Sequence, residues 1–466
     1  MITFRDQLLL GPMTVIDFVQ HAMDRHYLPL TFFVAACFLL PGRTFAQTDT
    51  LENTLSIRLQ SVTHGEACGG GLPRASVSSE DQSNFLYGRN RLIVGYERSA
   101  LEIYTVFQNT AIWGMKGNQS VNLYEGWAKL RSRHGLFAQA GRVALSYDDE
   151  RIIGTNDFAT AAYSHDVLRL GYEGHGHKLH AILAYNQNAD NMYSGTYYDG
   201  GAQYYKSMQT VWYHYDMPKF PLGASLLLMN IGQQAGMPDK ENDPARIEYQ
   251  RMMGGYLKYY PKVLTFEASY YRQTGKVVDE YKEVMPIEAW MASAKATVKP
   301  GDRWGFELGY DYLSGDDYVP VIYGGQFGLP RHEVERGFSP MYGSRNKFYG
   351  IMDYFYASAY TNGFTPGLQN AFIGAFGKPF SSLTCGITYH YLAVATHLED
   401  LERTLGHSVE LKLSYAISKD ITLSAGYTQM SGTDTMARLK EEGDSPQARW
   451  GWFSLAISPS LFSSKW

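Results

Sequence analysis

Apolar and polar side chains alternate with a period of two along much of the chain. The pattern is clearest near the C-terminus, in residues 405–416 and 420–431, which are separated by three residues. In the first of these segments the apolar positions are Val409, Leu411, Leu413 and Tyr415. Such alternation puts apolar side chains on one face of a strand and polar ones on the other. Repeated from hairpin to hairpin, it is typical of a transmembrane β-barrel.

Eight hairpins with short links follow one another along the chain. Their strands are residues 84–98 and 101–108, 121–132 and 135–143, 164–173 and 178–187, 203–216 and 222–233, 247–260 and 262–274, 283–298 and 303–314, 367–376 and 383–395, and 405–416 and 420–431. One further strand, residues 54–62, precedes them, and another, residues 448–458, follows them. The sequence therefore predicts an all-β fold, a single antiparallel transmembrane β-barrel of about 18 strands, and this even number is the rule for bacterial barrels.

The links alternate between short turns and longer loops. Outer-membrane barrels have short periplasmic turns and long external loops, so we assign the two kinds of link accordingly. The longest link, residues 315–366, contains an aromatic stretch at residues 341–356 that resembles one more strand. A nineteenth strand would break the even number, and we therefore expect this loop to fold into the lumen instead.

The N-terminus has the pattern of an export signal. Arg25 precedes an apolar run over residues 27–40, and small residues, Thr44 and Ala46, stand at the positions expected before a cleavage site. We expect residues 1–46 to be a signal peptide, with Met23 as an alternative start. Residues 47–466 then form the barrel.

Charged side chains in the strands are expected to face the lumen. A charge facing lipid at the membrane midplane costs roughly 2–4 kcal/mol, so the alternation places the charges inside. Basic residues of the first six strands are Arg58, Arg89, Arg91, Lys129 and Arg169. Acidic residues of the opposite wall are Glu267, Glu307 and Asp311, and the last hairpin adds Glu410 and Lys412. We expect a transverse electric field that selects solutes by charge.

Bulk composition narrows the function classes. The formal net charge of -5 argues against a nucleic-acid-binding protein, which is usually basic. Cys68 and Cys385 do not make a disulfide framework. The pair His175 and His177 offers too few ligands for a metal site. Acidic clusters at residues 148–150 and 316–317 offer oxygen atoms for Ca²⁺ but lack EF-hand spacing, so we predict no metal and no cofactor.

Aromatic residues gather toward the strand ends. Amphipathic rings of this kind suit the interface between lipid and water. The predicted girdle consists of Trp290, Trp304, Tyr310, Tyr312, Tyr427, Trp450 and Trp452.

Several segments resemble the alginate-export family of outer-membrane porins. These segments are Gly141-Arg142 with residues 147–151, Tyr342-Gly343 with residues 347–350 and 352–355, Leu405-Gly406-His407, and residues 426–430. The resemblance spans roughly residues 84–459. It implies an eighteen-stranded barrel that conducts a solute passively, and an archetype that passes an anionic polysaccharide. It also implies that Arg142, Arg151 and Arg169 line the pore, although the alternation independently supports Arg169 alone.

The function we expect is a passive channel in the outer membrane of a Gram-negative bacterium. Its solutes would be small or oligomeric polar or anionic molecules, with polysaccharide among the candidates. Its partners would be outer-membrane lipid, lipopolysaccharide and the barrel-insertion machinery. A barrel that presents its loops for binding or adhesion is the alternative. A hydrolase using a serine and a histidine, such as His390 or His397, at the outer wall is a third reading, but no nucleophile motif marks it.

Overall fold

The computed structural model of the 466-residue chain describes most of the barrel. The described residues are 52–69, 83–117, 119–160, 162–188, 205–236, 244–278, 284–316, 334–352, 365–398, 401–440 and 447–466. The expected signal peptide, residues 1–46, lies outside them. So do parts of several long links, including residues 317–333 and 353–364.

Nineteen strands and one short helix are present in the described residues. The first nine strands are β1 (Asn53–Gly69), β2 (Ser83–Arg98), β3 (Leu101–Ile112), β4 (Gln119–Arg131), β5 (Leu136–Val143), β6 (His165–Gly174), β7 (His177–Tyr185), β8 (Ser207–Asp216) and β9 (Leu222–Ala235). The others are β10 (Arg246–Tyr259), β11 (Leu264–Val278), β12 (Val284–Val298), β13 (Trp304–Leu313), β14 (Leu368–Phe380), β15 (Leu383–Ala393), β16 (Thr404–Ser418), β17 (Ile421–Gly432), β18 (Gln447–Ile457) and β19 (Ser460–Lys465), with α3 (Asp434–Lys440) between β17 and β18.

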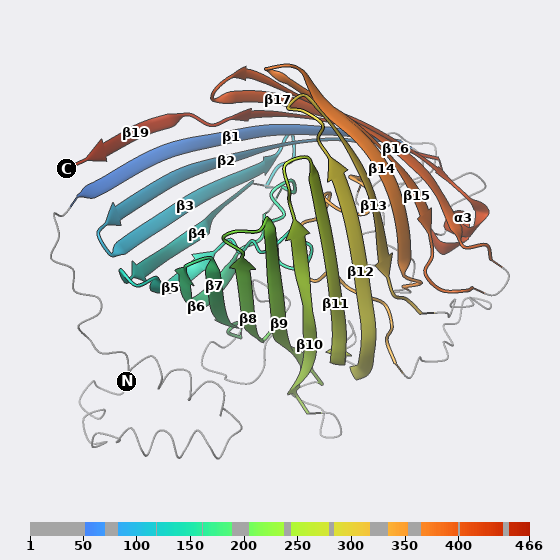
Figure 1. Ribbon diagram of the computed structural model, residues 1–466, viewed down its shortest axis with the longest axis horizontal. Helices are drawn as coiled ribbons and strands as arrows, with labels where there is room; N and C mark the ends of the chain where they lie inside the picture. The colour runs from blue at the N-terminus through green and yellow to red at the C-terminus, as the bar shows by residue number, and fades with distance from the viewer. Residues whose placement is uncertain are drawn as a thin grey trace. The chain divides into compact units, whose positions relative to one another are not determined.

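All of these strands belong to one sheet, in which β1 to β18 each pair with their neighbours in the chain (Figure 1). The sheet closes because β1 pairs antiparallel with β2 on one side and with β18 and β19 on the other. Closure leaves β1 to β18 paired on both sides, as a sheet in lipid requires, whereas β19 pairs with β1 alone in the described residues. The predicted fold class, an antiparallel barrel of 18 strands, is confirmed.

The nineteenth strand continues the eighteenth. β18 pairs with residues 61–69 of β1, and β19 pairs with residues 54–58 of the same strand. Ser458 and Pro459 separate the two, and the Pro459 carbonyl still accepts a hydrogen bond from the Leu59 amide at 3.2 Å. Because proline has no amide hydrogen to donate, the ladder is interrupted there without a change of partner.

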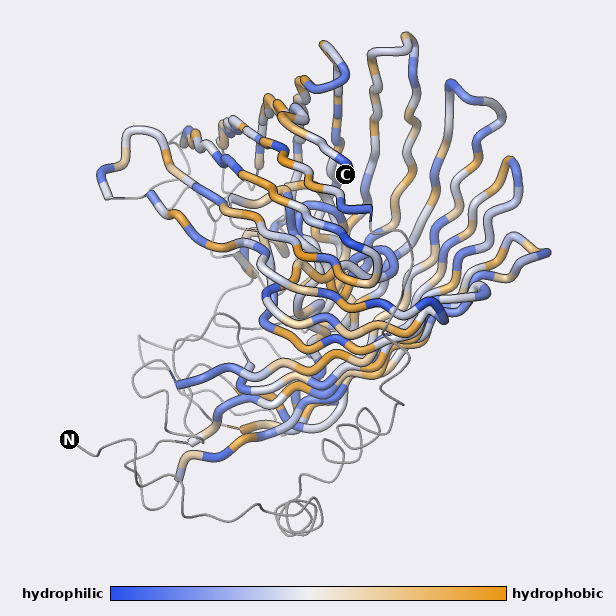
Figure 2. The backbone as a smooth tube through the Cα atoms, turned by 90° about the vertical axis from the view of Figure 1, so that its left-hand side faces the viewer, coloured by the Kyte–Doolittle hydropathy of each residue, from blue (hydrophilic) through white to orange (hydrophobic). Residues whose placement is uncertain are grey.

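Hydrophobic and hydrophilic residues alternate along the strands, as predicted (Figure 2). In β16, Val409, Leu411 and Leu413 are 40%, 46% and 51% exposed on the outer face, whereas Ser408 is 4% exposed on the inner face. Together, the apolar outer faces of adjacent strands form a belt around the barrel that can contact the lipid chains.

Two details of the prediction are wrong. β1 runs to Gly69 rather than ending at residue 62, because His64, Glu66 and Cys68 continue its buried inner face. Trp450 and Trp452 do not belong to the outer girdle. They are 3% and 6% exposed and face inward.

The longest loop begins and ends at one point on the barrel. Gly315 lies so close to Gly367 that a Cβ on Gly315 would come within 1.9 Å of the Gly367 nitrogen. The Asp316 amide bonds the Thr365 carbonyl at 2.8 Å beside this contact. Glycine is therefore needed where the two ends of the loop meet.

Neither a membrane-crossing helix nor a disulfide bond contributes to the barrel wall in the described residues. Among the described residues, no helix has the length and apolar character to cross a membrane. Cys68 of β1 and Cys385 of β15 are not joined by a disulfide.

Lysine in place of Leu411 tests which face contacts lipid. Leu411→Lys is expected to lower the free energy of unfolding by about 2–4 kcal/mol, because the ammonium group would enter the apolar belt. Denaturant titration of the refolded barrel in lipid vesicles measures this change. Ser414→Lys, on the inner face of the same strand, is the matched control and should cost far less. Equal losses in the two variants would contradict the assigned faces.

Candidate functional site: the barrel interior

Two segments between strands fill part of the lumen. We call residues 144–160, between β5 and β6, the first inner segment, and residues 334–352, between β13 and β14, the second inner segment. Their backbones pair with each other: the Gly154 amide bonds the Tyr342 carbonyl at 2.8 Å, and the Tyr342 amide bonds the Ile152 carbonyl at 3.1 Å. Residues 341–352 form no strand beyond this single bridge at Tyr342.

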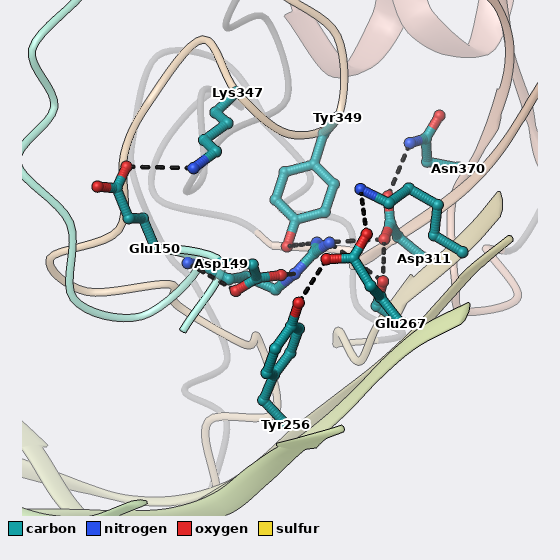
Figure 3. A network of polar contacts seen from close by, with 11 residues as sticks. Asp149, Glu150, Tyr256, Glu267, Asp311, Lys347, Tyr349 and Asn370 are labelled. Atoms are coloured by element: carbon teal, nitrogen blue, oxygen red, sulfur yellow. Dashed lines mark hydrogen bonds and ion pairs between the residues drawn. The ribbon is translucent and has the colours of Figure 1, made fainter. Parts of the chain in front are cut away.

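Side chains reinforce the pairing of the inner segments. The Ser344 hydroxyl donates to Glu150 at 2.9 Å and accepts from the Asn156 amide at 3.0 Å. Lys347 forms an ion pair with Glu150 at 3.2 Å (Figure 3). Burial alone would raise the pKa of Glu150, but hydrogen bonds and the Lys347 charge outweigh it and lower that pKa. Glu150 therefore stays ionised and holds the two segments together.

The backbone of these segments is strained at several residues. Positive φ angles occur at Asp148, Glu150 and Asn156 of the first segment and at Met341, Asn346 and Tyr349 of the second. Residues other than glycine rarely adopt this conformation, and each costs of order 1–3 kcal/mol. The surrounding contacts must hold the segments in place.

Arg151 is the central contact of the first inner segment. Its guanidinium group bonds Asp311 of β13 at 3.1 Å, the Tyr349 hydroxyl at 3.0 Å and Ser293 of β12 at 3.1 Å. It also lies 4.1 Å above the centre of the Phe348 ring. Although burial disfavours the charge, Tyr349 and the neighbouring carboxylates raise the pKa of Arg151, so it remains a cation. Figure 3 shows Tyr349 and Asp311 within this network of contacts.

A chain of polar contacts continues from Asp311 around the inner wall. Asn370 of β14 donates to Asp311 at 2.9 Å, and the Asn370 carbonyl oxygen lies 2.8 Å from the His390 ring nitrogen of β15. His390 faces Glu410 of β16 at 3.7 Å, and Glu410 accepts from the Ile351 amide at 2.6 Å. Four strands are thereby linked to the second inner segment.

His390 does not match the hydrolase interpretation. An outer-membrane hydrolase would need its histidine on the outer wall at the membrane interface. The structure places His390 inside, with 6% of its surface exposed and its ring nitrogens directed at an amide and a carboxylate.

The inward acid of β11, Glu267, lies beside the inward base of β12, Lys295. Glu267 accepts a short hydrogen bond from the Tyr256 hydroxyl of β10 and pairs with Lys295 at 2.8 Å (Figure 3). The expected acidic wall is thus partly neutralised at Glu267 by Lys295 and at Asp311 by Arg151. The transverse field is weaker than the strand sequences alone suggest.

The basic residues of β2 share a carboxylate from the first inner segment. Arg91 pairs with Asp157 at 2.7 Å and Arg89 pairs with it at 3.2 Å. Arg89 also donates to the Asp157 and Ala159 carbonyls at 2.9 and 3.0 Å. Arg91 lies 4.0 Å from the centre of the Tyr124 ring. One carboxylate therefore faces two guanidinium groups at this contact.

Basic residues of β4 and β6 form a second cationic area. Lys129 and Arg169 lie 4.2 and 5.5 Å from the centre of the Phe137 ring. Arg169 donates to the Tyr147 hydroxyl at 3.3 Å. The Glu173 carboxylate of β6 lies 3.1 Å from the His180 ring nitrogen of β7.

Five other predicted pore residues also lie on the inner side of the wall or in the inner segments. Arg58 and Lys412 are exposed on the inner faces of β1 and β16, and Glu307 is partly buried on the inner face of β13. Glu410 and Arg151 belong to the contacts described above. The side chains of these residues therefore lie inside the barrel.

Arg142 is placed differently from the expectation of a pore-lining residue. In β5 the buried inner positions are Phe137, Gln139 and Val143, so Arg142 falls on the outer face. It forms a two-pronged pair with Asp166 of β6 at 2.8 and 2.7 Å. This neutralising partner allows an arginine to remain on the outside of the barrel.

An apolar core inside the barrel was not predicted. Inward residues near the loop ends of the strands are apolar, and the inner segments add side chains to them. Members with at most 3% exposure include Leu145, Ile152, Ile153, Ile182, Met208, Ile231, Met252, Tyr271, Ile287, Met291, Phe338 and Tyr349. Methionine and isoleucine at alternate inward positions, where a wet lumen would have polar residues, are the signal that marks this core.

An open cavity of about 580 Å³ lies toward the turn end of β7, β8 and β10. Its lining residues are Asp148, Lys178, Trp212, His214, Asp216, Tyr256, Lys258 and Tyr260. Asp148 of the first inner segment forms part of it and accepts from the Trp212 ring at 3.1 Å. Burial raises the pKa of Asp148. Space for solute therefore remains on this side of the inner segments.

Metal binding finds no support in the described part of the chain, where no group of three or more histidine, cysteine or acidic residues is arranged to hold an ion. Asp317 of the second acidic cluster lies outside the described residues.

Comparison with known proteins supports the fold. No family model and no curated protein matches the sequence. The structure of Pseudomonas aeruginosa OccK2 (OpdF) in complex with glucuronate matches with a TM-score of 0.58 at 10% identity, over 88% of this chain and 97% of that one. A BenF-like porin from Pseudomonas fluorescens Pf-5 matches with a TM-score of 0.58 at 11% identity, over 87% and 99%. Pseudomonas aeruginosa OpdL matches with a TM-score of 0.57 at 12% identity, over 88% and 99%. The chain thus has the fold of a porin barrel.

Removing Arg151 should release the inner segments. Arg151→Met would leave Asp311 buried without its cation, and breaking a buried pair in this way costs about 3–5 kcal/mol. Hydrogen exchange of the amides at residues 342–350 is expected to accelerate. The double variant Arg151→Met/Asp311→Asn should recover part of the protection, because position 311 then no longer carries an unpaired buried charge. Unchanged exchange in Arg151→Met would contradict the anchoring role.

The attachment of the second inner segment to β12 should depend on pH. The Glu335 backbone bonds Pro286 and Glu288 at 2.8 and 2.9 Å. Burial and the nearby Asp316 raise the pKa of Glu335 to about 8. Because this pKa is above the ordinary value of 4.5, the attached segment binds the proton more tightly, and the attachment weakens as pH rises toward 8.

Hydrogen exchange at Glu335 and Glu288, corrected for intrinsic rates, should show this weakening between about pH 4.5 and 8 and no further change above that range. Glu335→Gln cannot ionise and should abolish it. The same pH dependence in the variant would assign the effect to another group.

Proposed function

We propose that this protein is a passive channel in the outer membrane of a Gram-negative bacterium. Its solutes would be small or oligomeric polar or anionic molecules, and it would need no cofactor. The observation that carries the proposal is the closed barrel, apolar outside, whose charged lumen is narrowed by two inner segments. In porins, side chains facing such a lumen select solutes by charge.

The charge balance favours anions on one side of the lumen. Arg89 and Arg91 share Asp157, and Arg169 and Lys129 add further positive charge nearby. The fold likeness to a barrel whose structure holds glucuronate supports an anionic solute. The resemblance to the alginate-export family supports a polysaccharide, and Arg151, in the segment that carries this resemblance, lies in the lumen. Arg142, on the outer face, does not contribute to this part of the proposal.

A loop-presenting binding or adhesion protein is the second candidate. The observation in its favour is the apolar core inside the barrel, which fills part of the lumen. Current through single molecules in a planar bilayer separates the two candidates. Conductance supports the channel. A barrel that stays silent after residues 334–352 are deleted supports the scaffold.

Reversing the charge of the basic wall tests the channel and its selectivity. The variant Arg89→Glu/Arg91→Glu/Arg169→Glu should move the reversal potential toward the cation-selective limit, about 59 mV for a tenfold salt gradient. The reason is that three positively charged side chains of the lumen wall become negatively charged. Arg449→Glu, an exposed outward position of β18, is the matched control and should leave the potential unchanged. Equal potentials in all three proteins would contradict selection by this wall.

A further inference from the structure

Polar residues form a row across the outer face of five neighbouring strands. Each residue of the row is the register partner of the next: Gln209 of β8, Asn230 of β9, Arg251 of β10, Thr274 of β11 and Glu288 of β12. Toward the turn end this face becomes apolar, with Leu226 and Leu228 of β9 being 63% and 57% exposed. The row therefore lies at the loop-end border of the apolar belt.

Aromatic rings mark the same border. Trp290 of β12 is the register partner of Arg272 of β11. Its ring lies 6.2 Å from that of Tyr270 and is stacked on Tyr312 at 4.6 Å. Tryptophan and tyrosine collect at the level of the lipid headgroups. Arg272 is level with this aromatic row, and Arg251 lies slightly closer to the loop end.

Arg251 and Arg272 are diagonal neighbours on the outer face. Arg251 pairs with Thr274, and Arg272 pairs with Met253, so the two arginines are offset by two residues on adjacent strands. Such positions lie about 7–8 Å apart, within the reach of two guanidinium groups that share one ligand. Both side chains are exposed.

The acid nearer the loop end, Glu248, is directed at other cations. Nearer the loop end, Arg246 and Lys276 both pair with Glu248, at 2.9 and 3.0 Å. Among the residues that the structure describes, Arg251 and Arg272 form no ion pair within 4.0 Å, and this includes the acid of the same row, Glu288. The outward Arg142, by contrast, has Asp166. Positive charge therefore remains at headgroup depth on β10 and β11.

We propose that Arg251 and Arg272 bind the phosphate group of a phosphorylated glycolipid in the outer leaflet. This rests on the proposed outer-membrane location. Two guanidinium groups match phosphate oxygens with charge-assisted hydrogen bonds. The exposed apolar belt below receives the acyl chains, and Trp290 and Tyr270 contact the region between them.

Native mass spectrometry of the full-length protein in detergent tests the site, with diphosphorylated lipid A as the probe. The wild type is expected to retain the lipid. Arg251→Ala/Arg272→Ala should weaken binding at least about tenfold, because both guanidinium groups that form charge-assisted hydrogen bonds with the phosphate are removed. Arg142→Ala, which removes an outward arginine that already has an acidic partner, is the matched control and should bind as the wild type does.

Two results would overturn the proposal. One is wild-type lipid affinity in the double variant, with its fold verified by heat-dependent mobility in gels. The other is displacement of lipid A by inorganic phosphate at the same concentration, which would show that a free anion suffices. The outcome is separate from channel function, because Arg251 and Arg272 lie outside the lumen. A silent channel that binds lipid A would refute the proposed transport and keep this site.

Discussion

The closure of the sheet is the constraint on which the rest of this structure depends. A backbone amide or carbonyl left unpaired in lipid costs several kcal/mol, so a membrane-spanning sheet must leave no edge. β1 meets this requirement by pairing with β2 along one side and with β18 and β19 along the other. Once the ring is closed, every strand has one side chain in two directed at lipid and the next directed inward. The apolar belt, the aromatic border and the charged interior follow from this geometry.

A closed ring of this size creates an interior that the strands alone cannot fill. The two inner segments occupy part of it, and they are held by polar groups of the wall. Arg151 links the first segment to Asp311, Ser293 and Tyr349, and Asp157 links it to Arg89 and Arg91. Charges that would otherwise set the field of an open pore thus also serve as attachment points. The interior that remains is narrower and more evenly charged than eighteen isolated strands would indicate.

Features that depend on the alternation of side chains within one strand could be predicted from the sequence. The period of two located all eighteen strands. The even count excluded residues 341–356 as a strand, and the described part of that stretch, residues 341–352, indeed forms none. Prediction from the sequence failed where a neighbouring strand decides the outcome. Arg142 is compatible with either face in isolation, and its pairing with Asp166 on the outer face follows from the register of β5 against β6. Trp450 and Trp452 resemble girdle residues, but they pack inward against His64 and Phe158.

The sequence by itself determined the fold class, the strands and which residues of each strand are charged, because alternation is a property of a single segment. Only the tertiary structure decided which charges meet. Asp157 reaches Arg89, and Tyr349 reaches Arg151, across 68 and 198 residues of chain. Contacts between loops and distant strands depend on how the ring closes around them, and no local pattern encodes that distance.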